Sequence, residues 1–439
     1  MVVDQPPARL KKPEASKVIA PQSLRRNFSW TIVGNVVYAI TQWAILTTIV
    51  KLGNPELLGE YALALALTAP VFAFSMLQLR GIQATDARNE YMFGQYWALR
   101  IMTSGFASIG LVLFAILSRY DRHLKLVIIL VVLVKCIDSL SDVLYGLFQK
   151  YEQMDMIARA QAINGVVSLA MFVGAMSLTQ SLLLGIIGSA FGSLAMLTYY
   201  ALRAQRLFGG VEPGASKTEM VRLLIPTWDI RSMSTLTVLA LPLGVVMMLN
   251  SLNTSIPRFV LEASYGKYEL GIYAGLAYLL VAGSTVCSAL GQSASPRLAK
   301  LFAKEESRRF MALLTRLILF GVGIGLAGAL LTIVAGRQLL TLIYSAAYAD
   351  QVNVMVALAI SASFTFAASF LGFGMTALRE FKSQFGIGVC VTLVGGIASL
   401  LLVPPFGLLG AAATLMIGQS IKILLASIVV KRAMLAINE

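Results

Sequence analysis

Apolar runs of about twenty residues recur from Trp30 to Val430, and this recurrence is the feature that most constrains the fold. A bilayer core about 30 Å thick is crossed by about 20 apolar residues in a helix. Of the 439 residues, 58% are hydrophobic and only 13% are charged, whereas a soluble domain carries about 25% charged residues. So few charges cannot cover a water-soluble surface, and lipid must be the solvent. The alternation typical of a membrane β-barrel is absent, so helical crossings are predicted.

The runs predict an all-α polytopic membrane protein with about twelve spans in two six-helix lobes. The predicted spans are 30–50, 61–79, 97–117, 126–147, 157–178 and 182–200, then 233–252, 270–290, 310–333, 352–375, 385–403 and 408–430. The corresponding domains are a disordered cytoplasmic tail at 1–22, an N-terminal lobe at 23–205, a cytoplasmic linker at 206–231, a C-terminal lobe at 232–432 and a tail at 433–439.

The basic residues predict the orientation of the chain. Lys and Arg outnumber Asp and Glu by 35 to 21, and most of them lie in the two tails and the even-numbered connections. In a membrane protein this bias marks the cytoplasmic side, so it does not point to nucleic acid. Both termini are therefore predicted to be cytoplasmic. The three cysteines lack metal-ligand spacing, no cofactor is expected, and His123 is predicted to be a solvated loop residue.

One short motif occurs twice, at the start of the second span and again at the start of the eighth. It reads Gly59-x-Tyr61-Ala62 in the first half and Gly271-x-Tyr273-Ala274 in the second. Because six spans separate the two copies, both halves enter the membrane in the same orientation. Parallel repeats of this kind bind substrate between the halves and alternate access by rocking. MATE-type and major-facilitator transporters both have such a repeat, so topology alone leaves the two open.

The stretch from 243 to 301 narrows this choice by resemblance. An apolar run there ends in Asn250, Asn253 and Ile256-Pro257-Arg258, and the second glycine motif then opens a run that closes at Ser295-Pro296-Arg297. These features, in this order, resemble the Wzx-like polysaccharide transporter branch of the MATE/MOP superfamily. Gly146-Leu147-Phe148-Gln149 resembles the segment between the family's fourth and fifth spans.

The resemblance implies a flippase of a bacterial inner membrane. Its substrate would be a polyprenyl-pyrophosphate-linked oligosaccharide, moved from the inner to the outer leaflet by alternating access with coupling to a proton or sodium gradient. Its partners would be membrane lipid and other polysaccharide-assembly proteins. The polyprenyl tail would stay in the bilayer, so the resemblance implies a net positive cavity between the lobes that opens sideways to lipid between spans one and eight.

Three ionisable residues lie inside the fourth apolar run. Lys135, Asp138 and Asp142 are spaced by three, four and seven positions, which places them on one helix face. Ionisable groups at such depth are costly and normally face a bundle interior or a water-filled cavity. One interpretation is that Asp138 and Asp142 form an ion-coupling site. The alternative is a structural ion pair.

Other polar residues in or beside the spans are candidates for substrate binding. They are the cations Arg25, Arg26, Arg80, Lys135, Arg258 and Lys422 and the amides Asn35, Asn250 and Asn253. A guanidinium pairs with phosphate through a bidentate fork, and amides suit sugar hydroxyls. The alternatives are snorkelling of the cations to lipid headgroups and helix–helix hydrogen bonds of the amides. Pro70, inside the second span, is predicted to kink that helix.

Rival functions differ in the residues they need. A multidrug or cation antiporter of the same fold would need an acidic cavity. A major-facilitator transporter would carry a Gly–Asp–Arg motif after its second span, and residues 81–88 have these residue types at the wrong spacing. An integral-membrane enzyme would need a catalytic constellation and a long outer loop, neither of which is evident. The chain is therefore predicted not to be an enzyme.

Overall fold

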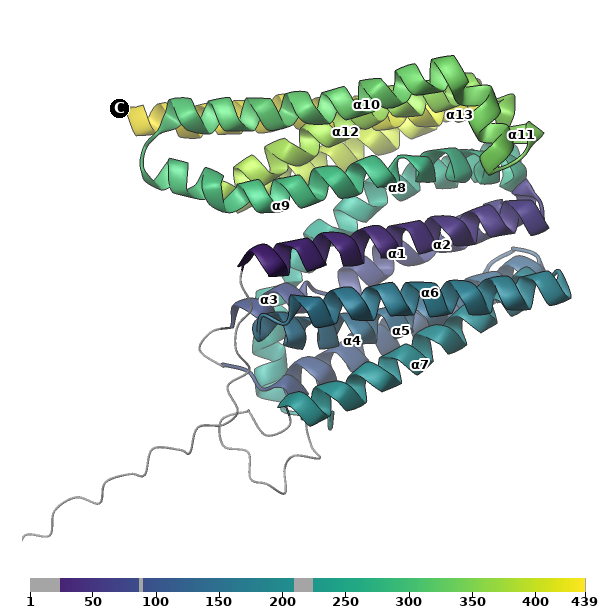
Figure 1. The fold of residues 1–439 in the computed structure, drawn as a ribbon, viewed down its shortest axis with the longest axis horizontal. Helices are drawn as coiled ribbons and strands as arrows, with labels where there is room; N and C mark the ends of the chain where they lie inside the picture. Colours follow the sequence, from purple (N-terminus) through teal and green to yellow (C-terminus); the bar gives the residue numbers. More distant parts are fainter. Residues whose placement is uncertain (1–23, 87–89, 209–223, 439) are drawn as a thin grey trace, which may run out of the picture.

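The computed structural model describes residues 24–86, 90–208 and 224–438, and every regular element in these ranges is a helix (Figure 1). The helices are α1 (Leu24–Leu52), α2 (Pro55–Ser75), α3 (Leu79–Thr85), α4 (Phe93–Leu117), α5 (Arg122–Lys150), α6 (Met154–Thr179), α7 (Leu182–Phe208), α8 (Ile230–Leu279), α9 (Val281–Ala303), α10 (Ser307–Ile343), α11 (Ala346–Ala349), α12 (Val352–Ala377) and α13 (Phe381–Asn438). The tail predicted at 1–22 and most of the predicted linker lie outside the described residues.

The described helices supply twelve segments that are long enough to cross a membrane. Nine of the helices are long and apolar enough to span it, counting α2 with α3 and α8 with α9 as one each. Two of the nine turn back on themselves, one at Gly266 and one at Gly407, where φ is +83° and +55°. Positive φ favours glycine, so each glycine lets one continuous stretch cross twice. α5, with charged residues in its middle, provides the remaining crossing. This confirms the predicted fold class.

The second span is interrupted at a place that the sequence does not signal. Its first helix begins where the Asn54 side chain accepts a hydrogen bond from the Leu57 N–H at 2.9 Å, with proline at the first helical position. The helix continues through Pro70 to Ser75, and the break follows at Leu77 and Gln78, both at positive φ. The interruption thus lies about two turns of helix beyond Pro70, where the sequence predicts a kink.

Two groups of helices form the molecule, and we call them the N-terminal lobe (α1–α7) and the C-terminal lobe (α8–α13) (Figure 1). At one end, which we call the closed end, α1 connects to α2 and α8 turns at Gly266. The opposite end, where α7 ends and α8 begins, is called the linker end.

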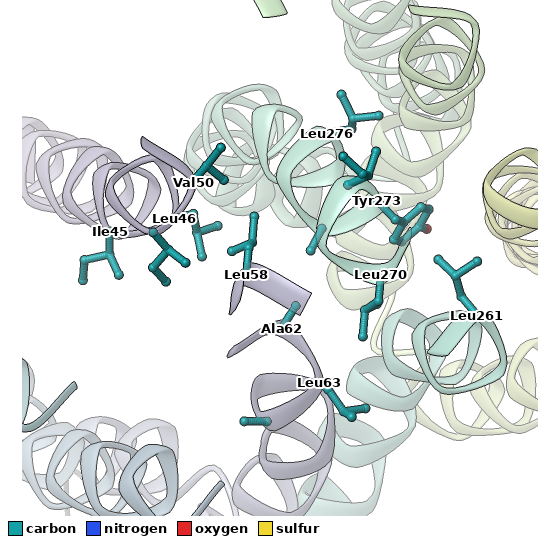
Figure 2. Packing of buried hydrophobic residues seen from close by; sticks show 14 of the residues in the cluster. Ile45, Leu46, Val50, Leu58, Ala62, Leu63, Leu261, Leu270, Tyr273 and Leu276 are labelled. Atoms are coloured by element: carbon teal, nitrogen blue, oxygen red, sulfur yellow. The ribbon is translucent and has the colours of Figure 1, made fainter. Parts of the chain in front are cut away.

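A single hydrophobic core joins both lobes at the closed end. Figure 2 shows part of it, with Leu46 and Val50 of α1 and Leu58 of α2 beside Leu270 and Tyr273 of α8. Tyr344, in the turn after α10, adds a polar contact across the lobes, because its hydroxyl accepts a hydrogen bond from the Trp43 indole of α1 at 3.2 Å. The lobes are thus sealed together at this end.

The two copies of the glycine motif lie at the centre of this seal. A Cβ on Gly59 would lie 1.7 Å from the carbonyl oxygen of Lys267, and a Cβ on Gly271 would lie 1.8 Å from that of Pro55. The backbones of α2 and α8 are therefore in direct contact, as small residues allow between membrane helices. Any side chain at either glycine would force the two lobes apart.

The lobes have separate cores at the linker end. One core, around Leu79, Tyr96 and Phe148, belongs to the N-terminal lobe and includes Met233 and Leu236 of α8. The other, around Phe310 and Leu314, belongs to the C-terminal lobe. The first turns of α8 thus pack on the N-terminal lobe, while its later turns pack on α12 and α13. The structure is sealed at the closed end and joined through α8 at the linker end.

Candidate functional site

The three ionisable residues in the middle of α5, Lys135, Asp138 and Asp142, do not form one cluster. Lys135 donates a hydrogen bond to Asp138 Oδ2 at 3.4 Å. Asp142 lies on the same helix but pairs elsewhere, with Arg80 of α3 at 3.6 Å and Arg100 of α4 at 3.1 Å. The spacing correctly places the residues within one span, and the pairing divides them into two sites.

Asp142 holds together three consecutive spans. Arg100 is fully buried and also donates to Ser139 Oγ at 3.4 Å. The Arg80 side chain is 30% exposed, donates from Nε to Gln149 Oε1 at 2.9 Å, and lies over the Tyr145 ring at 5.7 Å. Both guanidinium groups are therefore already engaged by protein. Arg80, which was predicted to bind substrate, has a structural contact network that its position in the sequence does not reveal.

Tyrosines surround the Lys135–Asp138 pair. Asp138 lies within electrostatic range of Tyr38 of α1, Tyr61 of α2 and Tyr145 of α5. Tyr278 of α8 interacts with Tyr38 and Tyr61, so the C-terminal lobe also contributes. We call Lys135, Asp138, Tyr38, Tyr61, Tyr145 and Tyr278 the central cluster. Its polar hydroxyls and its single ion pair lie where the two lobes meet.

Arg258 of α8 adjoins the central cluster from the C-terminal lobe. The groups that interact with it electrostatically are Tyr273 and Tyr278. Its Nε is buried and has no hydrogen-bond partner, and no Asp or Glu of the described chain pairs with it. Arg258 therefore carries a charge that the protein itself does not compensate. Arg80, Arg100 and Lys135 exceed Asp138 and Asp142 by one positive charge, and Arg258 adds a second.

Three of the predicted substrate residues come together at a different place. Asn250 and Asn253 of α8 and Lys422 of α13 line one cavity of about 70 Å³, bounded by α8, α12 and α13. All of its lining residues belong to the C-terminal lobe. The sequence predicted these residues for the same site as Arg258, whereas the structure gives them a pocket of their own.

The remaining residues that the sequence predicts to bind substrate are Asn35, Arg25 and Arg26. Asn35 lies partly buried on α1, one position after Gly34, whose backbone packs against Ala158 of α6. Arg25 and Arg26 fall in the first turn of α1, and their side chains lie outside the described residues. Their proposed role remains a prediction. In the described ranges no group of three or more His, Cys, Asp or Glu could hold a metal ion.

A charged cluster that the sequence did not predict spans the lobes at the closed end. Glu60 of α2 accepts a hydrogen bond from Lys267 Nζ at 2.9 Å and contacts His123 Nδ1 at 2.6 Å. Lys267 also donates to the Asp121 carboxylate. We call Glu60, Asp121, His123 and Lys267 the closed-end latch. His123, predicted to be a solvated loop residue, is 42% exposed but is held by Glu60.

The latch is anchored by the start of α5. Asp121 is the N-cap of that helix and accepts a hydrogen bond from the Leu124 N–H at 2.9 Å. The hydrogen bonds from Lys267 and from Leu124 hold the pKa of Asp121 below its ordinary value. The carboxylate is therefore ionised at neutral pH, and its attraction to Lys267 is lost only when the pH falls through that lowered pKa. The sequence signal that could have located the latch is Lys267, one residue after the turn glycine.

An apolar groove of about 380 Å³ lies between α1 and the α8–α9 helices. Val36, Ile40 and Trp43 line one wall, and Ala282 and Val286 line the other. Tyr278 of the central cluster is also a lining residue. The groove thus lies between spans one and eight, where the sideways opening was predicted, and it reaches the central cluster.

The different partners of Asp138 and Asp142 predict different effects of substitution. Asp142→Asn should leave Arg80 and the fully buried Arg100 without a carboxylate, a defect that costs about 3–5 kcal/mol in a dry site. We expect markedly less folded protein and a lower melting temperature in detergent. Asp138→Asn leaves only the partly exposed Lys135 unpaired, so the protein level should stay near normal while transport changes. Equal melting temperatures of the two variants would contradict this assignment.

Comparison with known proteins identifies the family of the chain and supports the fold. A family model described as "Polysaccharide biosynthesis protein" matches residues 24–302. The chain is 30% identical over 405 residues to the capsular polysaccharide biosynthesis protein CapF of Staphylococcus aureus, covering 91% of this chain and 97% of that relative.

Solved transporters share the architecture at low sequence identity. A MOP superfamily transporter from Pyrococcus furiosus, described as having a binding pocket of reverse polarity, superposes with a TM-score of 0.66 at 13% identity, over 94% of this chain and 96% of its own. The Vibrio cholerae MATE transporter VcmN superposes with a TM-score of 0.64 at 14% identity, again over 94% and 96%. These matches show the fold, which is that of the MATE/MOP superfamily.

Proposed function

This chain belongs to the polysaccharide biosynthesis protein family, and from that premise we propose that it is a flippase for a polyprenyl-pyrophosphate-linked oligosaccharide. The family and the fold are those of polysaccharide transporters and not of enzymes. The lipid carrier, the ion coupling and the bacterial inner membrane are parts of our proposal. The observation that carries it is a positively charged central region, with an uncompensated Arg258, directly beside an apolar groove.

Arg258 supports an anionic headgroup as the substrate. A buried guanidinium without a partner is costly in hydrocarbon, and a pyrophosphate would satisfy it through two parallel hydrogen bonds. The hydroxyl of Tyr278 lies beside it, and such a group suits the sugars that follow the phosphates. A drug or cation antiporter would need the opposite sign of charge at this place.

The groove between α1 and the α8–α9 helices supports the proposal that the substrate carries a lipid tail. A polyprenyl chain is too apolar to enter an aqueous vestibule, so it would stay in the bilayer while the charged headgroup crosses through the protein. An apolar groove that reaches Tyr278 provides such a route. On the other flank, α8 contacts both lobes, which favours the α1 side for lateral access.

The sealed end and the basic residues together support an orientation of the protein in the membrane and a direction of transport. Arg297, Lys300, Arg308 and Arg309 all lie near the linker end, around the α9–α10 connection. By the positive-inside rule this end faces the cytoplasm, and both termini follow it. The structure would then represent a state that is sealed toward the outside, ready to accept substrate from the inner leaflet. The Lys135–Asp138 pair is our candidate for proton or sodium coupling.

Blocking the groove tests the proposed route. Ala39→Trp and Ala282→Trp place a large side chain on either wall of the groove, so each should reduce transbilayer movement of a lipid-linked oligosaccharide about tenfold or more. The assay is access of an impermeant glycosidase to the glycan in proteoliposomes. Ile333→Trp on the exposed face of α10 is the matched control and should transport normally.

Two results would count against the flippase. Normal glycan translocation by both groove variants would rule out lateral access between α1 and α9. Uptake of an organic cation by proteoliposomes that show no glycan movement would favour the antiporter instead.

A further inference from the structure

We propose that the cavity around Lys422 is a second site, which binds a small anion such as a carboxylate or chloride, and that it is separate from the central cluster. The proposal does not depend on the flippase function, because it concerns binding within the C-terminal lobe alone. The anion could come from an acidic sugar of a glycan or from a free ion such as chloride. Both sources share the same chemistry, one negative charge of small size.

The location separates this cavity from the substrate region proposed above. Its walls are α8 at Val246–Asn253, α12 at Gly372 and Met375, and α13 from Gln384 to Ala426. No residue of α1–α7 lines it, and neither does Arg258. A ligand here would contact one lobe only, whereas a ligand of the central cluster would contact both.

Lys422 supplies the charge of the cavity. It lies deep in the protein and keeps part of its surface open to the space that it lines. No Asp or Glu lines the cavity, and in the described ranges none forms an ion pair with Lys422, whereas Arg80, Arg100 and Lys135 each have a carboxylate partner. An ammonium group offers three hydrogen-bond donors. Here the protein leaves them available to a ligand.

Snorkelling does not account for Lys422. Lys431 and Arg432 on the same helix are exposed and reach the linker end. Lys422 lies nine residues before Lys431, about 14 Å deeper along the helix axis. A lysine side chain is too short to cover that distance, so its charge stays inside the C-terminal lobe. A charge retained at such depth normally marks a functional site.

Amide side chains complete the site. Asn250, Asn253 and Gln384 line the same cavity, and the Oδ1 atom of Asn253 is buried without a hydrogen-bond partner. An amide can turn either its NH₂ donor or its oxygen toward a ligand. One ammonium and three amides can therefore bind an anion together with a hydroxyl or a bound water.

The cavity has room for a small ligand. Its volume of about 70 Å³ holds several water molecules, since each needs about 10–15 Å³. A carboxylate or a chloride ion therefore fits, and so does the acidic substituent of a sugar.

Anion-dependent thermal stability of the purified full chain tests the proposal. At constant ionic strength, isethionate, a weakly coordinating sulfonate, is replaced stepwise by chloride in one series and by glucuronate in the other. We expect the melting temperature of the wild type to rise with chloride, with glucuronate or with both. A response to chloride alone identifies a free ion as the ligand, and a response to glucuronate identifies a carboxylate.

Two variants establish whether Lys422 is responsible. Lys422→Gln should abolish the rise or weaken the apparent affinity about tenfold or more, as expected for one charge-assisted contact. Lys431→Gln, an exposed lysine on the same helix, should respond like the wild type. If Lys422→Gln does not fold, Lys422→Arg replaces it and should shift the apparent affinity for the anion.

The anion-dependent change in melting temperature does not depend on transport activity. Arg258→Ala, which should disable the flippase, should keep the full anion response, so failure of one proposal leaves the other intact. The second site would be overturned by a wild type that melts at the same temperature in all three salts. A Lys422→Gln or Lys422→Arg response identical to that of the wild type would overturn it equally.

Discussion

Lys267→Ala is expected to open the closed end and so to cause a large change in the conformation of the two lobes. Lys267 is the one member of the latch that belongs to the C-terminal lobe, and it compensates Glu60, whose side chain is only 7% exposed. Breaking a buried pair by removing one partner costs about 3–5 kcal/mol, and each 1.4 kcal/mol changes a population about tenfold. The sealed state should therefore be depleted about tenfold or more.

A buried reporter cysteine makes this shift measurable. Leu58 is fully buried in the shared core at the closed end, and Leu58→Cys in a background without the three native cysteines should react slowly with an impermeant maleimide. Adding Lys267→Ala should speed the reaction about tenfold, while Lys267→Arg, which keeps the charge, should change it little.

The control for the latch is an ion pair at the same end that does not join the lobes. Arg337 and Asp350 pair within the C-terminal lobe at 3.7 Å, and both side chains are largely exposed. Exposed pairs contribute about 0–1 kcal/mol, so Arg337→Ala should leave the labelling rate unchanged. Equal rates for Lys267→Ala and Arg337→Ala would show that the latch does not hold the lobes together.

Arg258→Ala should abolish most transport without harming the fold. A charge-assisted hydrogen bond to the substrate is worth about 1.5–3 kcal/mol, which corresponds to a loss of about tenfold to a hundredfold. Because the guanidinium has no carboxylate partner in the described chain, its removal also relieves an uncompensated buried charge. The melting temperature should therefore be unchanged or higher.

This combination distinguishes a binding residue from a structural one. Arg258→Lys keeps the charge but not the bidentate fork, so it should also lose transport while folding normally. Arg100→Lys is the contrasting case, since Arg100 is fully buried against Asp142 and its replacement should lower stability first. If Arg258→Ala lowered the melting temperature as much as Arg100→Lys, Arg258 would be a structural residue.

The spans were predictable because their signal is local. An apolar run long enough to cross a bilayer, such as the one that forms α12, is visible in the sequence without knowledge of its neighbours. The turn glycines Gly266 and Gly407 lie in the predicted connections between spans. The break at Leu77 and Gln78 could not be predicted, because leucine and glutamine are not residues that favour positive φ. Pro70, where a kink was predicted, lies inside α2, which continues to Ser75.

The sequence identified the candidate residues of the site, but it did not identify the ion pairs and hydrogen bonds that they form. Lys135, Asp138 and Asp142 were found from their depth in an apolar run, but the partners of Asp142 lie 62 positions away on α3 and 42 positions away on α4. His123 and Glu60 are 63 positions apart and meet only because α2 packs on α5. Lys422 and Arg258 belong to two different sites. This division became visible only from the packing of α8 against both lobes. Contacts of this kind depend on the arrangement of helices in three dimensions, which periodicity does not specify.

The glycine contact at the closed end has the geometry of an isologous interface within one chain. Gly59 meets the carbonyl of Lys267, four residues before Gly271, and Gly271 meets the carbonyl of Pro55, four residues before Gly59. In a two-fold homodimer, residue i of one subunit contacts j of the other while j contacts i, and the two halves of this chain reproduce that reciprocity.

The charges break this symmetry, although the backbone keeps it. By the same correspondence the counterpart of Lys267 is Pro55, and the counterpart of Glu60 is Ile272. Two identical subunits would carry either two latches or none, whereas this chain has one. Among the described residues, ion pairs therefore hold only one edge of the two-fold contact. The lobes can part along the other edge by breaking hydrogen bonds, such as that from Trp43 to Tyr344, without separating an ion pair.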